Sequence, residues 1–313
     1  MKNGKIILLA QALAGIGAAL PLVAQAAACG GSGLEVQVLG SGGPELPTKR
    51  ASTSYLVRLQ GKPRLLVDAG GGSALRFGES GATVSDLDAI LFSHLHIDHT
   101  ADFAALVKTS YFEARKRALP VLGPAGNAGF PSTDRFVRGL FDAENGVYRY
   151  LGGYLDANSG TYALKPQDVA PPADGIFLMA LNPEISLSAV SVIHGKVPAL
   201  AWRIDAGGAS VVFTGDGNGD NGAVQKLAKG AGLLVAHDAV GEDAKGPPRA
   251  LHMPPSRIGR SAAEAGVLAL VLGHRMQREL GHEEQTRREI ARSYTGPLSF
   301  ADDLDCFRVS PKP

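Results

Sequence analysis

Apolar and polar positions form short runs along most of the chain, separated by glycine, proline and polar clusters. Runs of this length predict β-strands, joined by turns and by segments with helical spacing. Strands are predicted at 34–39, 54–59, 64–67, 87–93, 120–123, 185–193, 199–205, 209–214, 233–236, 269–272 and 300–309. Helices are predicted at 74–78, 103–118, 132–141, 221–229, 256–265 and 282–294. The pattern indicates an α/β protein with two blocks rich in strands.

The segment 124–183 separates these blocks, and its periodicity is weak while aromatic residues and glycines accumulate. We expect an insertion packed over a functional site, where it would act as a substrate lid. The alternative is a scaffold loop whose aromatic side chains form a satellite core.

The N-terminal segment has the pattern of a secretory signal peptide. Lys2 and Lys5 precede an apolar run at 6–20, and small residues follow up to Ala28. This order predicts a cleaved signal peptide over residues 1–28 and a mature domain over 29–313. An uncleaved anchor is the alternative, but the run is short for a membrane span. We therefore expect a periplasmic or secreted protein with no stable membrane insertion after cleavage.

The two cysteines of the chain fit an exported protein. Cys29 follows the expected cleavage site and Cys306 lies near the C-terminus. In an oxidising compartment they could form a disulfide that joins the chain ends. The alternatives are a lipid-modified Cys29, although the leucine usual in a lipobox is missing, and a thiolate metal site, although both cysteines are distant from every histidine.

Composition and charge narrow the expected partners. The chain has 313 residues, 45% of them hydrophobic, which is enough for a sizeable core. Its 31 lysines and arginines almost balance 30 aspartates and glutamates, so the net charge is +1. Nothing in this balance favours a polyanion, and we expect a small-molecule substrate and no nucleic-acid partner.

The densest polar cluster is 93–100, directly after the apolar run 87–92. Alternate side chains of a strand share a face, so His94, His96 and Asp98 could point the same way. His99 could join them where the strand ends. Imidazole and carboxylate together suit zinc, with manganese and iron as competitors.

Other predicted strands also end in polar side chains, at Asp68, His194, Asp216 and His274. A single histidine at a strand end is more often a hydrogen-bonded structural residue than a ligand. The chain has only eight histidines, yet five of its predicted strands end in polar side chains. One shared role explains this recurrence more simply than five separate structural roles. Their recurrence predicts one metal site assembled from distant parts of the chain.

The stretch HLHIDH at 94–99 resembles the HxHxDH signature of the metallo-β-lactamase superfamily. This resemblance implies a four-layer αββα sandwich with the site at one edge, where strand ends from both halves meet. It also implies two divalent metal ions, zinc by preference, with Asp216 bridging them and Asp68 orienting a ligand histidine. The implied ligands are His94, His96 and His194 for one metal, and Asp98, His99 and His274 for the other.

The C-terminal half resembles the ribonuclease Z and arylsulfatase-like branch at 235–238, 252–256 and 262–274. An aspartate at the bridging position argues against true β-lactamases. By this resemblance His252 would be the general acid that protonates the leaving group, and a surface loop histidine is the alternative. His237 would support the ligands rather than bind metal. The chain departs from the branch at Asp238, where glutamate is usual, and at 253–254, where Ser-Thr is usual.

The resemblance implies an exported dinuclear zinc hydrolase that uses a metal-bridging hydroxide. Its expected substrates are small phosphodiesters or sulfate esters, and Asp98 and His252 are the expected catalytic residues. A lactonase or β-lactamase of the same fold and a non-catalytic metal-binding scaffold are the alternatives. The sequence is also compatible with a homodimer.

Overall fold

The computed structural model describes residue 1, residues 29–156 and residues 162–311. The expected signal peptide therefore lies, apart from Met1, outside the described residues. No helix in the described ranges is long and apolar enough to cross a membrane.

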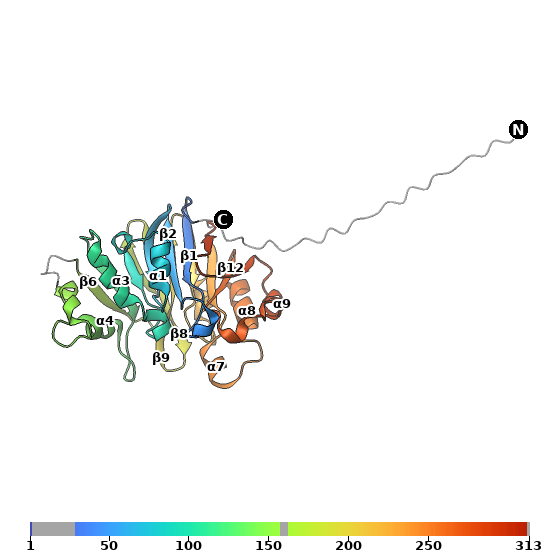
Figure 1. The fold of residues 1–313 in the computed structure, drawn as a ribbon. Coiled ribbons are helices and arrows are strands. Elements are labelled where there is room, and N and C mark those ends of the chain that lie inside the picture. The colour runs from blue at the N-terminus through green and yellow to red at the C-terminus, as the bar shows by residue number, and fades with distance from the viewer. Residues whose placement is uncertain (2–28, 157–161, 312–313) are drawn as a thin grey trace.

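Two seven-stranded sheets organise this part of the chain (Figure 1). The first has the order β14-β1-β2-β3-β4-β5-β6, antiparallel from β14 to β3 and parallel from β3 to β6. Its strands are β1 Leu34–Gly40, β2 Ser54–Leu59, β3 Lys62–Val67, β4 Ala89–Leu91, β5 Leu119–Pro124, β6 Leu164–Val169 and β14 Cys306–Arg308.

The second sheet has the order β13-β12-β11-β10-β9-β8-β7, antiparallel from β7 to β10 and parallel from β10 to β13. Gly207 and Gly208 both have positive φ in the β9–β10 turn, which confirms the predicted hairpin. The strands are β7 Phe177–Asn182, β8 Ile185–His194, β9 Val197–Ala206, β10 Ala209–Phe213, β11 Leu233–His237, β12 Leu270–Gly273 and β13 Leu298–Phe300.

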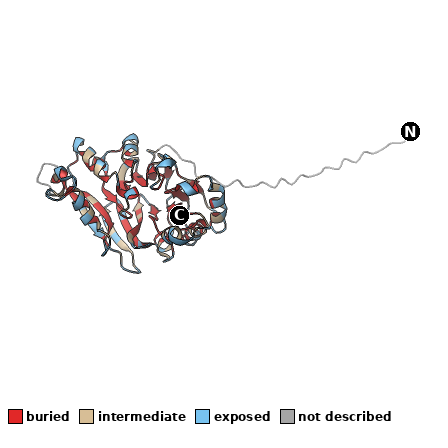
Figure 2. Cartoon of the chain, turned by 60° about the horizontal axis from the view of Figure 1, so that its bottom comes forward, coloured by how far each residue is buried: buried red, intermediate tan, exposed pale blue. Residues whose placement is uncertain are grey.

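The two sheets bury apolar side chains against each other and against outer helices. In β2, Tyr55 and Val57 belong to the core between the sheets, whereas Leu56 packs in the outer core. Trp202 of β9 is fully buried, and its Nε1 donates to the Phe92 carbonyl 2.9 Å away. Both faces of the central strands are therefore buried, as their nearly continuous apolar runs require (Figure 2).

Helices cover the outer face of each sheet, which confirms the expected four-layer sandwich. The first sheet carries α1 Ser73–Glu79, α3 Phe103–Thr109 and α4 Thr133–Phe141. The second carries α6 Ala223–Leu227, α8 Pro255–Ala265 and α9 Glu283–Ala291. The short helices are α2 Ile97–Thr100, α5 Gly153–Asp156 and α7 Gly246–Leu251.

The segment 124–183 supplies an edge strand to each sheet, β6 and β7, together with α4 and α5. Neither strand is predicted from the sequence. In β6 the pattern is broken by Pro166 and charged residues, which are typical of an edge strand. The loop before α4 reaches the β8–β9 turn, where the Asn127 side chain donates to the Lys196 carbonyl at 3.0 Å. A lid function for the segment 124–183 stays a prediction.

Two predicted elements differ from the structure. The helix expected over 103–118 ends at Thr109 and continues as the 3₁₀ turn Ser110–Phe112. The single strand expected over 300–309 is two strands, β13 and β14, that belong to different sheets. The chain crosses between the sheets at 301–305, where Leu304 has a φ of 70°. Cys306 of β14 forms a disulfide with Cys29, with a Cα–Cα distance of 5.5 Å.

Candidate metal centre

Histidines and aspartates from both halves of the chain meet at the C-terminal end of β8 and in the loops that follow β4, β10 and β12. The strand β4 ends at Leu91, and residues 97–100 form the helical turn α2. The expectation that His94, His96 and Asp98 alternate along one strand is therefore wrong. The Thr100 hydroxyl donates to the His96 carbonyl at 3.0 Å and closes this turn. A loop followed by a helical turn brings the side chains together instead.

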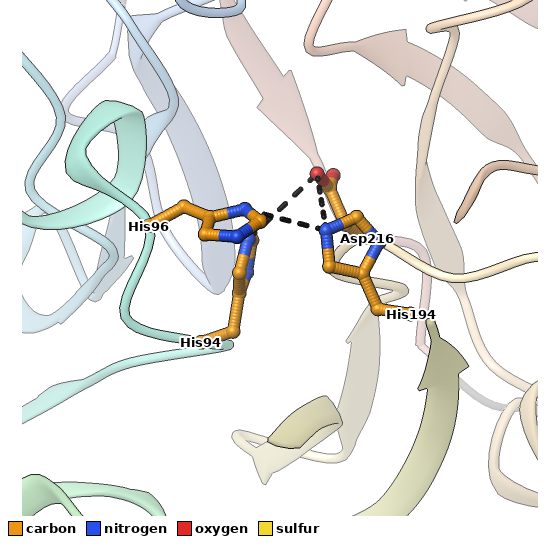
Figure 3. A group of neighbouring side chains, drawn as sticks. All are labelled: His94, His96, His194 and Asp216. Carbon is orange, nitrogen blue, oxygen red and sulfur yellow. Dashed lines mark hydrogen bonds and ion pairs between the residues drawn. The ribbon is translucent and has the colours of Figure 1, made fainter. Parts of the chain in front are cut away.

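The first ligand group contains His94, His96, His194 and Asp216, whose ligand atoms all lie within 4.8 Å of one another. Figure 3 shows His94 and His96 pointing toward His194 and Asp216. His194 Nε2 is 3.3 Å from His96 Nδ1 and 3.7 Å from Asp216 Oδ2. Tetrahedral ligands of a zinc ion lie about 3.4 Å from one another. The spacing therefore suits one small cation.

The second ligand group contains Asp98, His99 and His274. His99 Nε2 lies 3.6 Å from Asp98 Oδ2, and His274 Nε2 lies 3.9 Å from the same oxygen. Asp216 reaches this group as well, with its Oδ1 at 3.7 Å from His274 Nε2 and its Oδ2 at 3.7 Å from His99 Nε2. One buried carboxylate thus adjoins both groups, and the structure brings all seven expected ligands together.

Two nitrogen atoms of the ligand groups lack the partner that a cation would supply. His94 Nε2 and His99 Nε2 are buried and have no hydrogen-bond partner among the described residues. A buried polar atom without a partner costs about 1–3 kcal/mol. Metal ligation would satisfy both atoms, so the residues present fit a pair of divalent ions.

Partners outside the two groups hold the histidine rings by their other nitrogens. Such contacts set the tautomer and the orientation of a ligand ring. The pairs are His94 Nδ1 with Ser93 Oγ at 3.1 Å, His99 Nδ1 with Asp68 Oδ2 at 2.8 Å, His194 Nδ1 with the Leu251 carbonyl at 3.0 Å, and His274 Nδ1 with Thr53 Oγ1 at 2.6 Å. Asp68 thus lies where the resemblance placed it.

Backbone strain accompanies two of these contacts. Asp68 and His274 have φ values of 59° and 50°, in the left-handed region that few residues other than glycine adopt. Ser93 holds Asp68 by donating from its backbone N–H and its hydroxyl, both at 2.7 Å. Strain of this kind persists only where the surroundings determine it, and it clusters at functional sites.

Replacing Asp68 by asparagine should weaken metal binding by about 10–100-fold, because His99 loses the carboxylate that orients its ring. The amide keeps the size of the side chain, so the thermal unfolding of the metal-free protein serves as the control for folding. Competition with a zinc chelator measures the affinity. An unchanged affinity would contradict the orienting role of Asp68.

The charges of the site favour the metal-binding protonation state at three ligands, His94, His274 and Asp216, whereas at His99 a metal ion would have to displace a proton. Burial lowers the pKa of His94 and of His274 well below the ordinary value, so both are neutral imidazoles. Burial opposes the charged form of Asp216, but His274 and His99 outweigh it and hold the pKa of that carboxyl well below its usual range. Burial also opposes a charged His99, yet Asp68 and Asp216 raise its pKa to about 9.

Two further histidines border the centre. His252 follows α7 and is only 9% exposed, and its Nδ1 lies 3.9 Å from Asp216 Oδ2. Burial lowers the pKa of His252 to about 4. His237 Nδ1 hydrogen-bonds Asp216 Oδ1 at 2.6 Å, and its ring stacks on His274 with centroids 4.8 Å apart. Both therefore contact the centre, and their catalytic and supporting roles stay predictions.

Sequence reasoning missed the residues that hold α7 against the site. The Asn218 side chain donates to the Ala250 carbonyl at 3.1 Å, next to the Leu251 carbonyl that accepts from His194. Arg249 donates to Asp220 at 2.9 Å and links the same two loops. A backbone carbonyl carries no signal in the residue type, so only Asn218, two residues after Asp216, could have been found.

Comparison with known proteins agrees with this geometry. The family model described as the metallo-β-lactamase superfamily matches residues 47–274. A ribonuclease Z of Mycolicibacterium paratuberculosis is 33% identical over 290 residues, which cover 88% of this chain and 98% of that protein. A ribonuclease Z of Mycolicibacterium gilvum is 31% identical over 292 residues, covering 89% and 97%. The chain belongs to the metallo-β-lactamase superfamily, whose fold and site define it as a metal-dependent hydrolase.

Solved structures show the same fold. The metallo-β-lactamase fold protein YhfI of Bacillus subtilis has a TM-score of 0.66 and 23% identity, and covers 88% of this chain and 98% of its own. The short form of human tRNase Z has a TM-score of 0.66 and 18% identity, covering 88% and 99%.

The curated relatives correct one expectation from the sequence. They are named ribonuclease Z, and ribonucleases act on RNA. The expected small-molecule ester substrate and the expected absence of a nucleic-acid partner are therefore wrong. Overall net charge misled here, because it averages over the whole surface and says little about a local substrate site.

Proposed function

We propose that this protein is a dinuclear-metal phosphodiesterase that hydrolyses RNA outside the cytoplasm. The observation that carries the proposal is the meeting of two buried ligand groups at one carboxylate, Asp216. Similarity to ribonuclease Z over almost the whole of both chains supports a phosphodiester substrate.

The residues that would hold the two metal ions are those of the two groups described above, with Asp216 shared between them. When bound, a pair of divalent ions activates water as a nucleophile and stabilises negative charge on the attacked phosphoryl group. The ligand set contains no cysteine, and both imidazole and carboxylate are present, so zinc and manganese are the candidates to test first.

His252 is the residue best placed to give a proton to the leaving oxygen. Its Nδ1 is buried, has no partner among the described residues and faces Asp216. The anionic phosphate of a bound substrate would raise the pKa of His252 from about 4 toward neutrality, because a nearby negative charge favours the imidazolium. Substrate binding would thus favour the protonated form of His252, which is the form that can act as the proton donor.

Export is the second part of the proposal. The signal-peptide pattern of residues 1–28 supports it, and so does the disulfide between Cys29 and Cys306, since such bonds persist in oxidising compartments. An intact mass that starts near residue 29, in protein recovered from outside the cytoplasm, would support this placement. A full-length chain in the cytoplasm would contradict it.

The proposed function has a direct test. Purified protein should contain about two metal equivalents and hydrolyse bis(p-nitrophenyl) phosphate and a short single-stranded RNA. Chelation should abolish both activities, and zinc or manganese should restore them. Two bound metals with activity on a lactone or a carbapenem, and none on either phosphodiester, would overturn the assignment.

A further inference from the structure

A cavity of about 300 Å³ is lined by residues of three loops that leave the metal centre. Three of the loops that carry site histidines continue into its wall. Gly241 follows His237, Pro255 follows His252, and Arg278 with Glu279 follows His274. These loops connect the metal centre to the cavity, whose volume is at the lower end of the range for small-molecule sites, about 300–1,000 Å³.

Arg278 links the cavity to the centre. Its Nη2 lies 3.4 Å from Met276 Sδ. Gly43 packs against both Met276 and the ligand His274. A methyl group on its Cα would lie 3.2 Å from Met276 Cγ and 3.4 Å from His274 Nε2, so Met276 is close to His274. Arg278 is exposed and takes part in none of the ion pairs of the described chain. Its charge acts on the carboxylate of neighbouring Glu279, but an exposed guanidinium outside any close ion pair still offers donors to a phosphate.

The cavity lining mixes acceptors and donors instead of presenting one charge. Glu279 is 4% exposed, and Glu242 already accepts a hydrogen bond at 2.8 Å from the Ser256 backbone at the start of α8. Lys245 and Gln285 line the same space. Three carboxylates, Glu242, Asp243 and Glu279, and two cations, Lys245 and Arg278, share the lining, so the interior of the cavity favours neither a free anion nor a metal ion. A neutral heterocycle with both donors and acceptors, such as a nucleobase, suits this lining.

We propose that the cavity binds one unpaired nucleobase of the substrate RNA, next to the scissile phosphodiester, and that Arg278 binds the adjoining phosphate. The proposal rests on the proposed function and names the part of the RNA that the site selects. Buried Glu279 accepts from an exocyclic amino group, as carboxylates do from cytosine. Cytosine, adenine or guanine is therefore preferred over uracil at that position.

Short single-stranded RNAs that differ by cytosine or uracil at one position test this. At one position beside the cleaved bond, wild-type kcat/KM should favour cytosine by about tenfold. Glu279→Gln, which keeps the size of the side chain but adds a donor, should reduce this preference to about twofold or less. Arg278→Ala should lower the ratio of kcat/KM on RNA to that on bis(p-nitrophenyl) phosphate by about tenfold, and Arg278→Lys should restore part of it.

Arg288→Ala is the matched control, because Arg288 is exposed on α9 and does not line the cavity. It should change neither the base preference nor the ratio. The nucleobase site would be overturned by equal kcat/KM for cytosine and uracil at every position, together with an unchanged ratio of kcat/KM on RNA to that on bis(p-nitrophenyl) phosphate in Arg278→Ala. Hydrolysis itself would persist in that case. Absence of hydrolysis of bis(p-nitrophenyl) phosphate by the metal-loaded wild type would overturn the proposed function instead.

Discussion

Replacement of Asp216 by alanine should lower kcat/KM for bis(p-nitrophenyl) phosphate by about 10³-fold or more, equivalent to about 4 kcal/mol of lost transition-state stabilisation. Asp216 is the carboxylate that adjoins both ligand groups, with its two oxygens 3.7 Å from His274 Nε2 and His99 Nε2. Its loss would leave each of the two proposed metal ions with one ligand fewer. Elemental analysis should find fewer than two metals per chain.

The carboxylate also organises the surrounding histidines, which enlarges the expected effect. His237 donates to Asp216 at 2.6 Å, and the nearest oxygen of Asp216 lies 3.8 Å from His94 Nε2. Without this negative charge, the first group keeps only imidazoles to bind a cation, and the second group keeps Asp98 as its one carboxylate. Metal binding should therefore weaken in both groups and not only in one.

Asp174→Ala is the control for this prediction, because Asp174 is an exposed aspartate whose side chain lies outside both ligand groups. It should retain the metal content and the activity of the wild type. Far-ultraviolet circular dichroism should show that both variants are folded. Full metal loading and near wild-type hydrolysis by Asp216→Ala would contradict the shared-ligand role.

Loss of the Cys29–Cys306 disulfide should lower the free energy of unfolding by about 3–5 kcal/mol. The bond joins residues separated by 277 positions, so it restricts the unfolded chain over almost the whole mature domain. It also holds the N-terminal residues to β14, which pairs with β1 at the edge of the first sheet. For a domain of this size, the melting temperature should fall by about 6–15 °C.

The double variant Cys29→Ser and Cys306→Ser measures this effect by thermal unfolding, with the oxidised wild type as the reference. Reduction of the wild type should reproduce the shift, and reduction of the double variant should change nothing, since it contains no other cysteine. Two free thiols in non-reduced protein that was recovered from outside the cytoplasm would contradict the disulfide.

Local sequence patterns determined most of the secondary structure and the identity of the site. Short, largely apolar runs along 54–59 and 209–214 predicted strands, and both faces of these strands are buried, because residue type records burial locally. The stretch 94–99 and the polar ends of distant strands named all seven residues of the two ligand groups. Cys29 and Cys306 gave the alternative of a disulfide that the structure contains.

The tertiary structure decided what depends on contacts between distant segments. Residues 97–100 form a helical turn and not a strand, because the loop after β4 must aim His96 and His99 into different ligand groups. The last apolar run divides between two sheets, which depends on the partners of β13 and β14 and not on their own residues. The Leu251 carbonyl that holds His194, and the cavity beside Arg278, arise only from packing. The sequence thus determined which residues make the site, and the fold determined how they meet, because residue type records burial period and ligand chemistry but not strand order or the position of backbone carbonyls.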